Sequence, residues 1–316
     1  MPAADRSPGV SVSFDFVPAR PYSLAGTAER FARFPDAVDL FDGAVYRRLL
    51  PVRPAALLSV RQEGAPAAAL LRVRLEGPGA AGPGARAAAV RILQRSLGAS
   101  SDVQPFERAF RRDPLLASAV ARHRGLRVAG SPTIWESLVL AVLAQQIHLR
   151  FAASIRRDLV LAFGRRARIG RQLFLDFPTP ERIAAAGARG LNGFRLSKGK
   201  RDTILRLARG FAGGALSEEH LESLPDEAFV ERLTRIRGVG RWTAEVALLR
   251  GAGRPDAFPA GDLSIIKYLA VGLLGRAAPS TEREMREISE RWRPHRSLAL
   301  AYMYAALAGK TKEEKK

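Results

Sequence analysis

The chain has 316 residues, of which 47% are hydrophobic, and this is enough for two ordinary hydrophobic cores or one large one. It contains no cysteine, which excludes disulfide bonds, a thiolate zinc site and a cysteine-ligated iron–sulfur cluster. Its 51 Lys and Arg residues outnumber its 31 Asp and Glu residues, giving a formal charge of +20. Such a charge attracts polyanions and favours a nucleic-acid partner, with a basic surface kept for solubility as the alternative.

The first part of the chain is predicted to form a small α+β domain. Some segments alternate apolar and polar residues with the period of a half-buried strand, and others have helical spacing. In chain order these are a strand at 10–18, a helix at 27–33, strands at 56–62 and 69–77, and a helix at 87–97. We expect an antiparallel sheet with its helices in a domain of residues 10–112, after a flexible terminus of residues 1–9.

The rest of the chain is predicted to be almost entirely helical, so that the fold class is mainly α with an N-terminal α+β domain. We assign residues 113–308 to the helical part and residues 309–316 to a charged, disordered tail. Helical spacing predicts one continuous helical stretch, a loop that carries Phe174, and a series of shorter helices. The ranges are 133–163 for the first stretch and 179–190, 197–211, 224–236, 262–275, 281–292 and 295–309 for the later helices.

The sequence favours a cytosolic protein. The longest apolar run of the helical part, Leu138–Ala144, is far too short to span a bilayer. The first residues lack the apolar segment that is typical of a signal peptide. We therefore expect no membrane partner.

The segment 233–251, LTRIRGVGRWTAEVALLRG, contains a tight Gly-x-Gly turn between two apolar-periodic segments. Gly238 and Gly240 permit positive φ angles and leave the backbone amides open to a ligand. A helix that follows the turn directs its free amides and its positive dipole end toward the same place. Arg241 adds charge there and Thr243 adds a hydroxyl. The motif predicts a helix-hairpin-helix that binds phosphate, with a plain helix connection as the alternative.

Asp262 is the candidate for chemistry on a bound nucleotide. It follows a Pro/Gly loop and precedes an apolar helical segment, which is a common place for an N-cap aspartate. It also lies one helix and one loop from the phosphate-binding turn, in a chain with no other candidate nucleophile. We expect one carboxylate oxygen to cap the helix and the other to face the substrate.

Aromatic and amide side chains could complete a base-binding site. Trp242 and Tyr304 are suited either to core packing or to stacking on a nucleobase, most favourably a cationic one. Gln145 and Gln146 interrupt an apolar helical face. The two adjacent side-chain amides are either hydrogen-bonded polar groups of the core or groups that face nucleic acid. The sequence pattern alone leaves both readings open.

Several motifs, in order and spacing, resemble the helix-hairpin-helix DNA glycosylases of the bacterial 3-methyladenine DNA glycosylase II type. These motifs are LAQQI (143–147), FPTPERIAAA (177–186), LSKGKRDTILRLA (196–208), IRGVGRWTAEVALLRG (236–251), DAFPAGD (256–262) and RWRPHRS (291–297). More weakly, FDGAVYRRLL (41–50) resembles part of the extra α+β domain of that type, which is similar to half of a TATA-binding-protein fold. The resemblance implies the helical glycosylase domains with this N-terminal domain.

Position by position, the resemblance implies roles for several residues. Asp262 stands at the family's essential aspartate, and Gln146 stands where a side chain wedges into the gap left by the extruded nucleotide. Trp242, Tyr304 and Gln145 are implied to line the base pocket. The hairpin residues implied to contact the DNA backbone are Gly238, Val239, Gly240, Arg241 and Thr243.

Trp242 also has an implication for the reaction. Relatives that cleave the DNA strand carry a Schiff-base lysine at this position, and a tryptophan cannot form an imine. The resemblance therefore implies a monofunctional glycosylase without lyase activity, which releases alkylated purines such as 3-methyladenine and 7-methylguanine from double-stranded DNA. It implies a monomer without a cofactor or an iron–sulfur cluster. A structural Na⁺ or K⁺ is implied only at the carbonyls of Thr234, Ile236 and Gly238.

Two alternatives stay open from the sequence. One is a glycosylase of the same fold that removes uracil or an oxidised or deaminated purine. The other is a non-catalytic protein that uses the hairpin only to hold the DNA backbone. Val246 and His295 stand where relatives have a pocket tyrosine and a common tryptophan, so we expect a less aromatic pocket and leave the range of lesions open.

Overall fold

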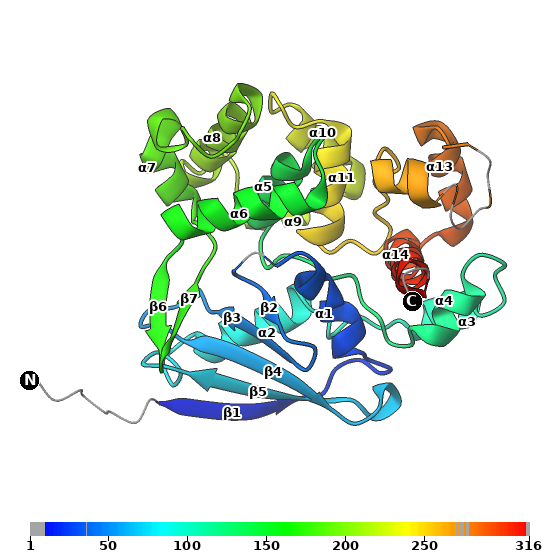
Figure 1. Ribbon diagram of the computed structural model, residues 1–316, viewed down its shortest axis with the longest axis horizontal. Helices are drawn as coiled ribbons and strands as arrows, with labels where there is room; N and C mark the ends of the chain where they lie inside the picture. Colours follow the sequence, from blue (N-terminus) through cyan, green and yellow to red (C-terminus); the bar gives the residue numbers. More distant parts are fainter. Residues whose placement is uncertain (1–9, 36, 270, 272–274, 276–277, 314–316) are drawn as a thin grey trace, which may run out of the picture.

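The computed structural model describes residues 10–35, 37–269, 271, 275 and 278–313. About half of the chain is helical, and a small antiparallel sheet lies beneath the helical part (Figure 1). Among the described helices, none combines the length and the apolar character needed to cross a membrane. The mainly helical class with an N-terminal α+β portion agrees with the prediction.

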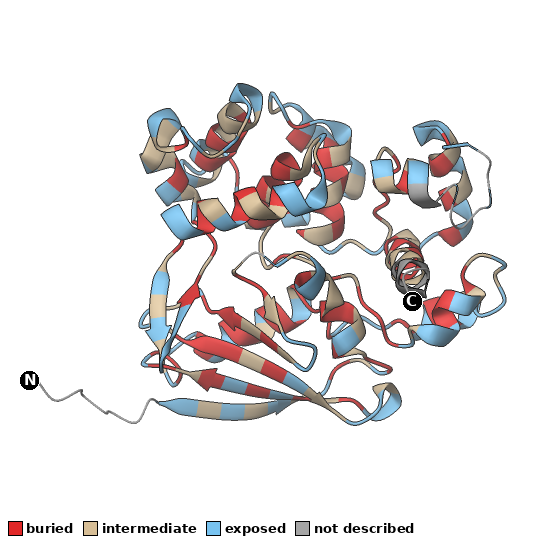
Figure 2. Ribbon diagram, in the orientation of Figure 1, coloured by how far each residue is buried: buried red, intermediate tan, exposed pale blue. Residues whose placement is uncertain are grey.

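The N-terminal sheet has five antiparallel strands in the order β1-β5-β4-β3-β2. Their bounds are β1 Ser11–Phe16, β2 Leu40–Phe41, β3 Val45–Leu49, β4 Leu57–Glu63 and β5 Leu70–Glu76. Along β5 the side chains of Leu71, Val73 and Leu75 are buried, whereas Arg72 and Arg74 between them are exposed (Figure 2). This two-residue alternation buries one face of the sheet.

Two helices, α1 (Leu24–Arg33) and α2 (Ala85–Arg95), pack on the buried face of the sheet and complete the first hydrophobic core. Both helices and strands β1, β4 and β5 were predicted within a few residues. Strands β2 and β3 were missed, because β2 has two residues and β3 contains two consecutive arginines, Arg47 and Arg48. Arg48 is buried and paired with acidic side chains, so β3 does not show the alternation of apolar and polar residues that marks a half-buried strand.

The second hydrophobic core is helical and contains residues from Val103 onward, together with Val38. Its helices are α3 Gln104–Phe110, α4 Ala117–Arg122, α5 Ile134–Ala144, α6 Leu149–Phe163, α7 Pro180–Gly190, α8 Lys198–Ala212, α9 Glu218–Ser223, α10 Asp226–Thr234, α11 Arg241–Arg250, α13 Glu282–Ser289 and α14 Arg296–Glu313. Short turns of other helix types are η1 Pro66–Ala68, η2 Ser264–Leu269 and η3 Glu290–Trp292. Phe106 of α3 packs on Tyr302 of α14, with 4.9 Å between the ring centroids. The predicted domain boundary after residue 112 stays a prediction, although α3 already belongs to the helical core.

Most helix starts follow local capping rules. The side chains of Thr179, Ser197 and Thr281 each accept a hydrogen bond from a backbone amide of the first helical turn. Thr281 forms a full capping box with Glu284. Pro180 occupies the first turn of α7, as predicted.

The prediction of one continuous helical stretch over 133–163 is wrong. Helix α5 ends at Ala144 and α6 begins at Leu149, and between them Gln146 has a φ of 54°. The side chain of His148 caps α6 by accepting a hydrogen bond from the Arg150 amide. The break is set by this cap and by contacts with distant residues, which the apolar periodicity does not record.

The predicted loop around Phe174 is instead a β-hairpin of β6 (Arg166–Ile169) and β7 (Gln172–Leu175). It extends from the helical part to the N-terminal sheet (Figure 1). Phe174 packs there against Leu49 and Leu57 in a small third core. The hairpin is stabilised by this long-range contact, which explains why its own short strands gave no clear signal.

A buried ion network also joins the two parts. Arg48 of β3 donates to Asp39 (2.7 Å) and to Glu136 of α5 (2.5 Å). Arg156 of α6 donates to Glu136 (2.8 Å) and to Asp39 (3.3 Å), and all four residues are buried. Burial alone would raise the pKa of Asp39, but the guanidinium groups of Arg48 and Arg156 lower it below its ordinary value. Because a buried charge without its partner is costly, this network fixes the sheet relative to α5 and α6.

Candidate active site

A cleft of about 1850 Å³ lies between helix α1 and the helical part of the chain. The predicted catalytic residue Asp262 lines it, as do the other residues predicted for the base pocket and the wedge. Those residues are Trp242, Tyr304, Gln145 and Gln146. The fold thus brings together side chains that are up to 159 positions apart in the sequence, from residue 145 to residue 304.

Both carboxylate oxygens of Asp262 accept hydrogen bonds. Oδ1 accepts from the backbone amide of Ser264 at 2.8 Å, and Oδ2 accepts from Trp242 Nε1 at 3.0 Å. The predicted capping function is confirmed, although the described part of the helix that follows is the π-helical segment η2. The remainder of the predicted helix, to residue 275, lies mostly outside the described residues. The second oxygen is oriented by the indole, so the carboxylate has a fixed direction in the cleft.

Tyr304 and Arg250 lie beside this carboxylate. Burial raises the pKa of Tyr304 above its ordinary value, the Asp262 carboxylate raises it further, and Arg250 and Arg30 partly offset the rise. Burial lowers the pKa of Arg250, whose Nη1 donates to the Ala129 carbonyl at 2.6 Å. Tyr304 therefore remains a neutral phenol across the physiological pH range. It offers the cleft an aromatic face and a hydroxyl next to Asp262.

The two glycines of the helix-hairpin-helix turn, Gly238 and Gly240, differ in backbone conformation and in surroundings. Gly238 has a φ of 94°, and a Cβ there would lie 1.9 Å from Thr203 Oγ1, so only glycine fits. Gly240 instead has a φ of −86° and caps α11 in an extended conformation, and a Cβ there would meet nothing within 4 Å. Of the two glycines that permit a positive φ, only Gly238 therefore adopts one. The missing side chain of Gly240 leaves space outside the protein, in front of the first amides of α11.

Two side chains of the helix-hairpin-helix, those of Val239 and Thr243, are buried. Val239 is buried in the helical core, so only its backbone can face a ligand. Thr243 is only 2% exposed, and its hydroxyl accepts a hydrogen bond from Gln145 Nε2 at 2.9 Å. Thr243 also lines the cleft, and its contact with the DNA backbone stays a prediction.

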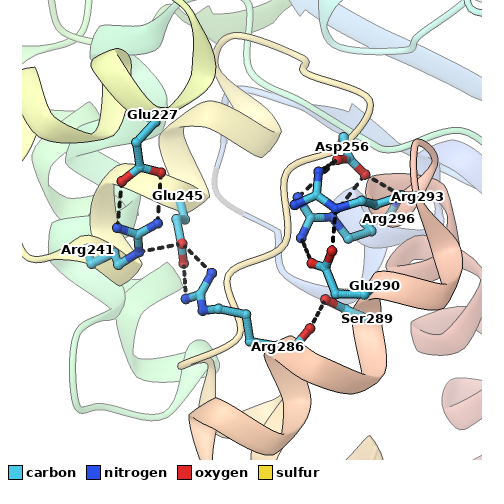
Figure 3. Close-up of polar contacts among 9 residues, drawn as sticks. All are labelled: Glu227, Arg241, Glu245, Asp256, Arg286, Ser289, Glu290, Arg293 and Arg296. Carbon is cyan, nitrogen blue, oxygen red and sulfur yellow. Dashed lines mark hydrogen bonds and ion pairs between the residues drawn. The ribbon is translucent and has the colours of Figure 1, made fainter.

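The positive charge that Arg241 was predicted to place beside the Gly-x-Gly turn is neutralised by ion pairs with two glutamates. Its guanidinium forms a bidentate pair with Glu227 (2.9 and 3.0 Å) and donates through Nε to Glu245 (3.0 Å) (Figure 3). Hydrogen bonding to Glu227 raises the pKa of Arg241 above its ordinary value. Glu245 is buried and also binds Arg286 of α13 at 3.0 Å. These contacts fasten α11 to α13, and a contact of Arg241 with the DNA backbone stays a prediction.

A second ion cluster positions the loop that leads to Asp262. Asp256 accepts a bidentate pair from Arg296 at the start of α14 (2.9 and 3.0 Å) and a further bond from Arg293 at 2.6 Å (Figure 3). Glu290 binds the same two arginines. The cluster fixes the loop to α14, the helix that carries Tyr304. This cluster was not predicted, because the surplus of arginine in the sequence masks individual ion pairs.

The two glutamines lie on the connection between α5 and α6. Gln145 lines the cleft, but its Nε2 donates to the Gly238 carbonyl at 3.1 Å as well as to Thr243. Gln146 is exposed, lines the cleft and has a backbone in the left-handed region. The base-pocket role of Gln145 and the wedge role of Gln146 stay predictions.

Most of the residues that line the cleft were not anticipated, among them side chains from the N-terminal part and two exposed leucines. Arg30 and Phe34 reach the cleft from α1 in the N-terminal part, and Leu149 and Leu263 are apolar side chains with 38% and 68% exposure. Leu263 directly follows Asp262, so it could have been predicted as a cleft residue from its position in the sequence. The residues of α1 gave none, because they lie more than 200 positions before the hairpin. Within the described residues, Val246 lines the cleft, whereas His295 packs on Phe106 and does not.

Comparisons with known proteins identify the family. Residues 139–294 match the model of the HhH-GPD superfamily of base excision DNA repair proteins. A DNA-3-methyladenine glycosylase of Bacillus subtilis is 34% identical over 218 residues, which are 69% of this chain and 72% of that protein. The chain therefore belongs to the HhH-GPD superfamily, and the predicted family is confirmed.

Solved structures agree with this assignment. The 3-methyladenine DNA glycosylase of Archaeoglobus fulgidus has a TM-score of 0.79 at 24% identity, over 94% of this chain and 98% of that one, which shows the same fold. The 3-methyladenine DNA glycosylase of Schizosaccharomyces pombe, in complex with abasic DNA, is 30% identical with a TM-score of 0.50. That match covers 60% of this chain and 87% of the other.

Proposed function

We propose that this chain is a monofunctional DNA glycosylase that hydrolyses the N-glycosidic bond of alkylated purines, of the 3-methyladenine and 7-methylguanine type, in double-stranded DNA. The observation that carries the proposal is the oriented carboxylate of Asp262, in a cleft that also contains the hairpin and aromatic side chains. The names of the relatives, which are 3-methyladenine DNA glycosylases, support the same substrate class.

The mechanism follows from the chemistry of an alkylated purine. Methylation at N3 or N7 makes the ring cationic, so the bond between C1′ and N9 breaks with its electron pair going to the departing base. The sugar then has oxocarbenium character, which the nearby Asp262 carboxylate stabilises electrostatically. Water attacks C1′, and Asp262 accepts its proton. The bonds from Trp242 and Ser264 keep the carboxylate in position throughout.

The hairpin holds the DNA backbone in this proposal. Backbone amides at the start of α11 bind a phosphate in the space that Gly240 leaves open. A monovalent cation at the carbonyls of Thr234, Ile236 and Gly238 would link the hairpin to a second phosphate. The Ile236 carbonyl already accepts from the Val239 amide and that of Gly238 from Gln145, and each keeps a second lone pair for an ion. Such an ion has no part in bond cleavage.

Trp242 occupies the position next to the catalytic carboxylate, 3.0 Å from Asp262. Its indole nitrogen cannot form an imine with C1′, so we expect no cleavage of the strand after base release. Borohydride should accordingly trap no covalent complex between the protein and DNA. Trapping would contradict this part of the proposal.

Two positive charges favour a second candidate substrate. Arg250 and Arg30 act electrostatically on Tyr304 in the cleft, and their positive charge would partly offset the attraction of the Asp262 carboxylate for a cationic base. A neutral purine with a carbonyl acceptor, such as a deaminated or oxidised one, would be tolerated better there. We also propose that the N-terminal sheet is similar to half of a TATA-binding-protein fold and that its domain ends near residue 112. We propose a cytoplasmic location for the protein.

The direct test is release of free bases from defined duplexes. Duplexes with 3-methyladenine, 7-methylguanine, hypoxanthine, 8-oxoguanine or uracil are incubated with the protein, and the released bases are identified by chromatography. The proposal predicts release of the methylated purines and an intact strand with an abasic site. Release of only neutral bases would support the second candidate, and binding without any release would support the non-catalytic alternative.

A further inference from the structure

The side chain of Lys200, on the first turn of α8, ends at the break between α5 and α6. Its Nζ donates to the carbonyl of Leu143 at 2.9 Å and to that of Gln145 at 2.7 Å. The last turn of α5 contains no basic residue of its own, and its terminal carbonyls have no partner within the helix. Lys200 therefore supplies the cation that the C-terminus of α5 lacks.

The bond to the Gln145 carbonyl controls the backbone of the next residue. This carbonyl belongs to the peptide unit that joins Gln145 to Gln146, so holding it fixes the plane of that peptide. Gln146 then adopts a φ of 54°, a conformation that is unfavourable for a residue other than glycine and needs support from its surroundings. Without Lys200, the peptide between Gln145 and Gln146 loses the side-chain bond to its carbonyl that favours this conformation.

Helix α8 also contacts the hairpin. Thr203, one turn after Lys200, packs so closely on Gly238 that no Cβ would fit there. From the other side, the Gln145 side chain donates to the Gly238 carbonyl. The connection that carries Gln146 and the turn that faces the DNA backbone are thus held by the same helix.

We propose that Lys200 is a positioning residue for base extrusion, which holds Gln146 in the direction needed to enter the duplex while the hairpin holds the backbone. The inference rests on the proposed function, because it takes Gln146 as the wedge. Lys200 acts through the backbone of Gln145 and does not touch the reacting atoms. It should therefore matter for opening the base pair and not for breaking the glycosidic bond.

The test compares Lys200→Met with Lys198→Met. Methionine keeps the apolar stem and removes the ammonium in both variants, and Lys198 is an exposed residue on the same turn. Two duplexes carry 7-methylguanine, in one paired with cytosine and in the other unpaired in a bulge, where extrusion costs less. A third duplex carries 2-aminopurine at the target position, whose fluorescence rises on unstacking and needs no chemistry. Thermal unfolding checks that each variant is folded.

We expect Lys200→Met to slow single-turnover release from the paired duplex about tenfold or more and to restore it to within about threefold of wild type on the bulge. The 2-aminopurine signal should fall with Lys200→Met and persist with Lys198→Met, while both variants lose similar affinity for undamaged DNA.

Equal losses on both lesion duplexes, or an unchanged 2-aminopurine signal, would overturn the positioning role. A selective loss of affinity with Lys200→Met alone would instead make Lys200 a phosphate contact. If the wild type releases no base at all, the proposed function fails, and the fluorescence comparison still decides the role of Lys200.

Discussion

The helical wall of the cleft holds its functional side chains in defined hydrogen bonds, whereas the N-terminal wall adds side chains of α1 from a separate hydrophobic core. On the helical wall, Asp262 is held by Trp242 and Ser264, and Gln145 is held by the hairpin. On the N-terminal wall, Arg30 and Phe34 face the same cleft. In the proposed function, the helical wall carries the reaction and the N-terminal wall modifies which base is accepted.

The largest effect is expected where the two walls are joined. Arg48→Met removes one of the two buried arginines that Asp39 and Glu136 share, which leaves the network with a net buried negative charge and should lower the free energy of unfolding by about 3–5 kcal/mol. Because the pKa of Asp39 is lowered in the folded state, the stability from this group is complete above its ordinary value and is lost as the pH falls through the folded-state pKa. Denaturant unfolding at several pH values measures both effects.

Arg47→Met is the matched control for that variant. Arg47 lies on the same strand, and its ion pair with Asp42 is partly exposed, so its loss should cost less than about 1 kcal/mol. Equal destabilisation by the two variants would mean that the buried network contributes no more than a surface pair.

An intermediate effect is expected at the hairpin on the helical wall. Gly240→Asp gives α11 a better N-cap, so the fold should be unchanged or more stable by a few tenths of a kcal/mol. The added carboxylate would occupy the space proposed for a phosphate and should weaken DNA binding by about tenfold or more. Fluorescence anisotropy with a labelled duplex gives the Kd.

Gly240→Asn separates charge from size, since asparagine caps equally well and is neutral. It should weaken DNA binding less than Gly240→Asp. If neither variant changes the affinity, the hairpin is not the site of backbone contact.

The smallest effect is expected on the N-terminal wall. Arg30→Met removes a positive charge that acts on Tyr304, and should increase release of 7-methylguanine relative to hypoxanthine by about fivefold, or about 1 kcal/mol. Arg33→Met is the control, because Arg33 lines the cleft from the same helix and is exposed. An identical change of preference in both variants would refute a specific role for α1.

Local signals explain what the sequence predicted correctly. The caps at Thr179 and Ser197 and the Gly-x-Gly turn act over a few residues, so the helices and the hairpin followed from them. Asp262 was found because it lies close to the hairpin in sequence. Its second contact, with the Trp242 indole, depends on the fold.

Long-range contacts explain what the sequence did not predict. The hairpin of β6 and β7 is buried against a distant sheet, and the break at Gln146 is held by Lys200 from another helix. The charge of Arg241 was counted as free on the rim, because composition does not reveal its pairing with Glu227. Arg30 reaches the cleft only through the packing of one core on the other.

The central claim is that Asp262 enables hydrolysis of the glycosidic bond, and Asp262→Asn tests it most directly. Asparagine keeps the size and an oxygen that can accept the Ser264 amide, but it removes the negative charge. Single-turnover release of 7-methylguanine from a duplex is measured for wild type and variant, with the Kd for the same duplex. We expect a rate loss of about 10²-fold or more with a Kd within about threefold of wild type. Release at the wild-type rate by the folded variant would contradict the claim.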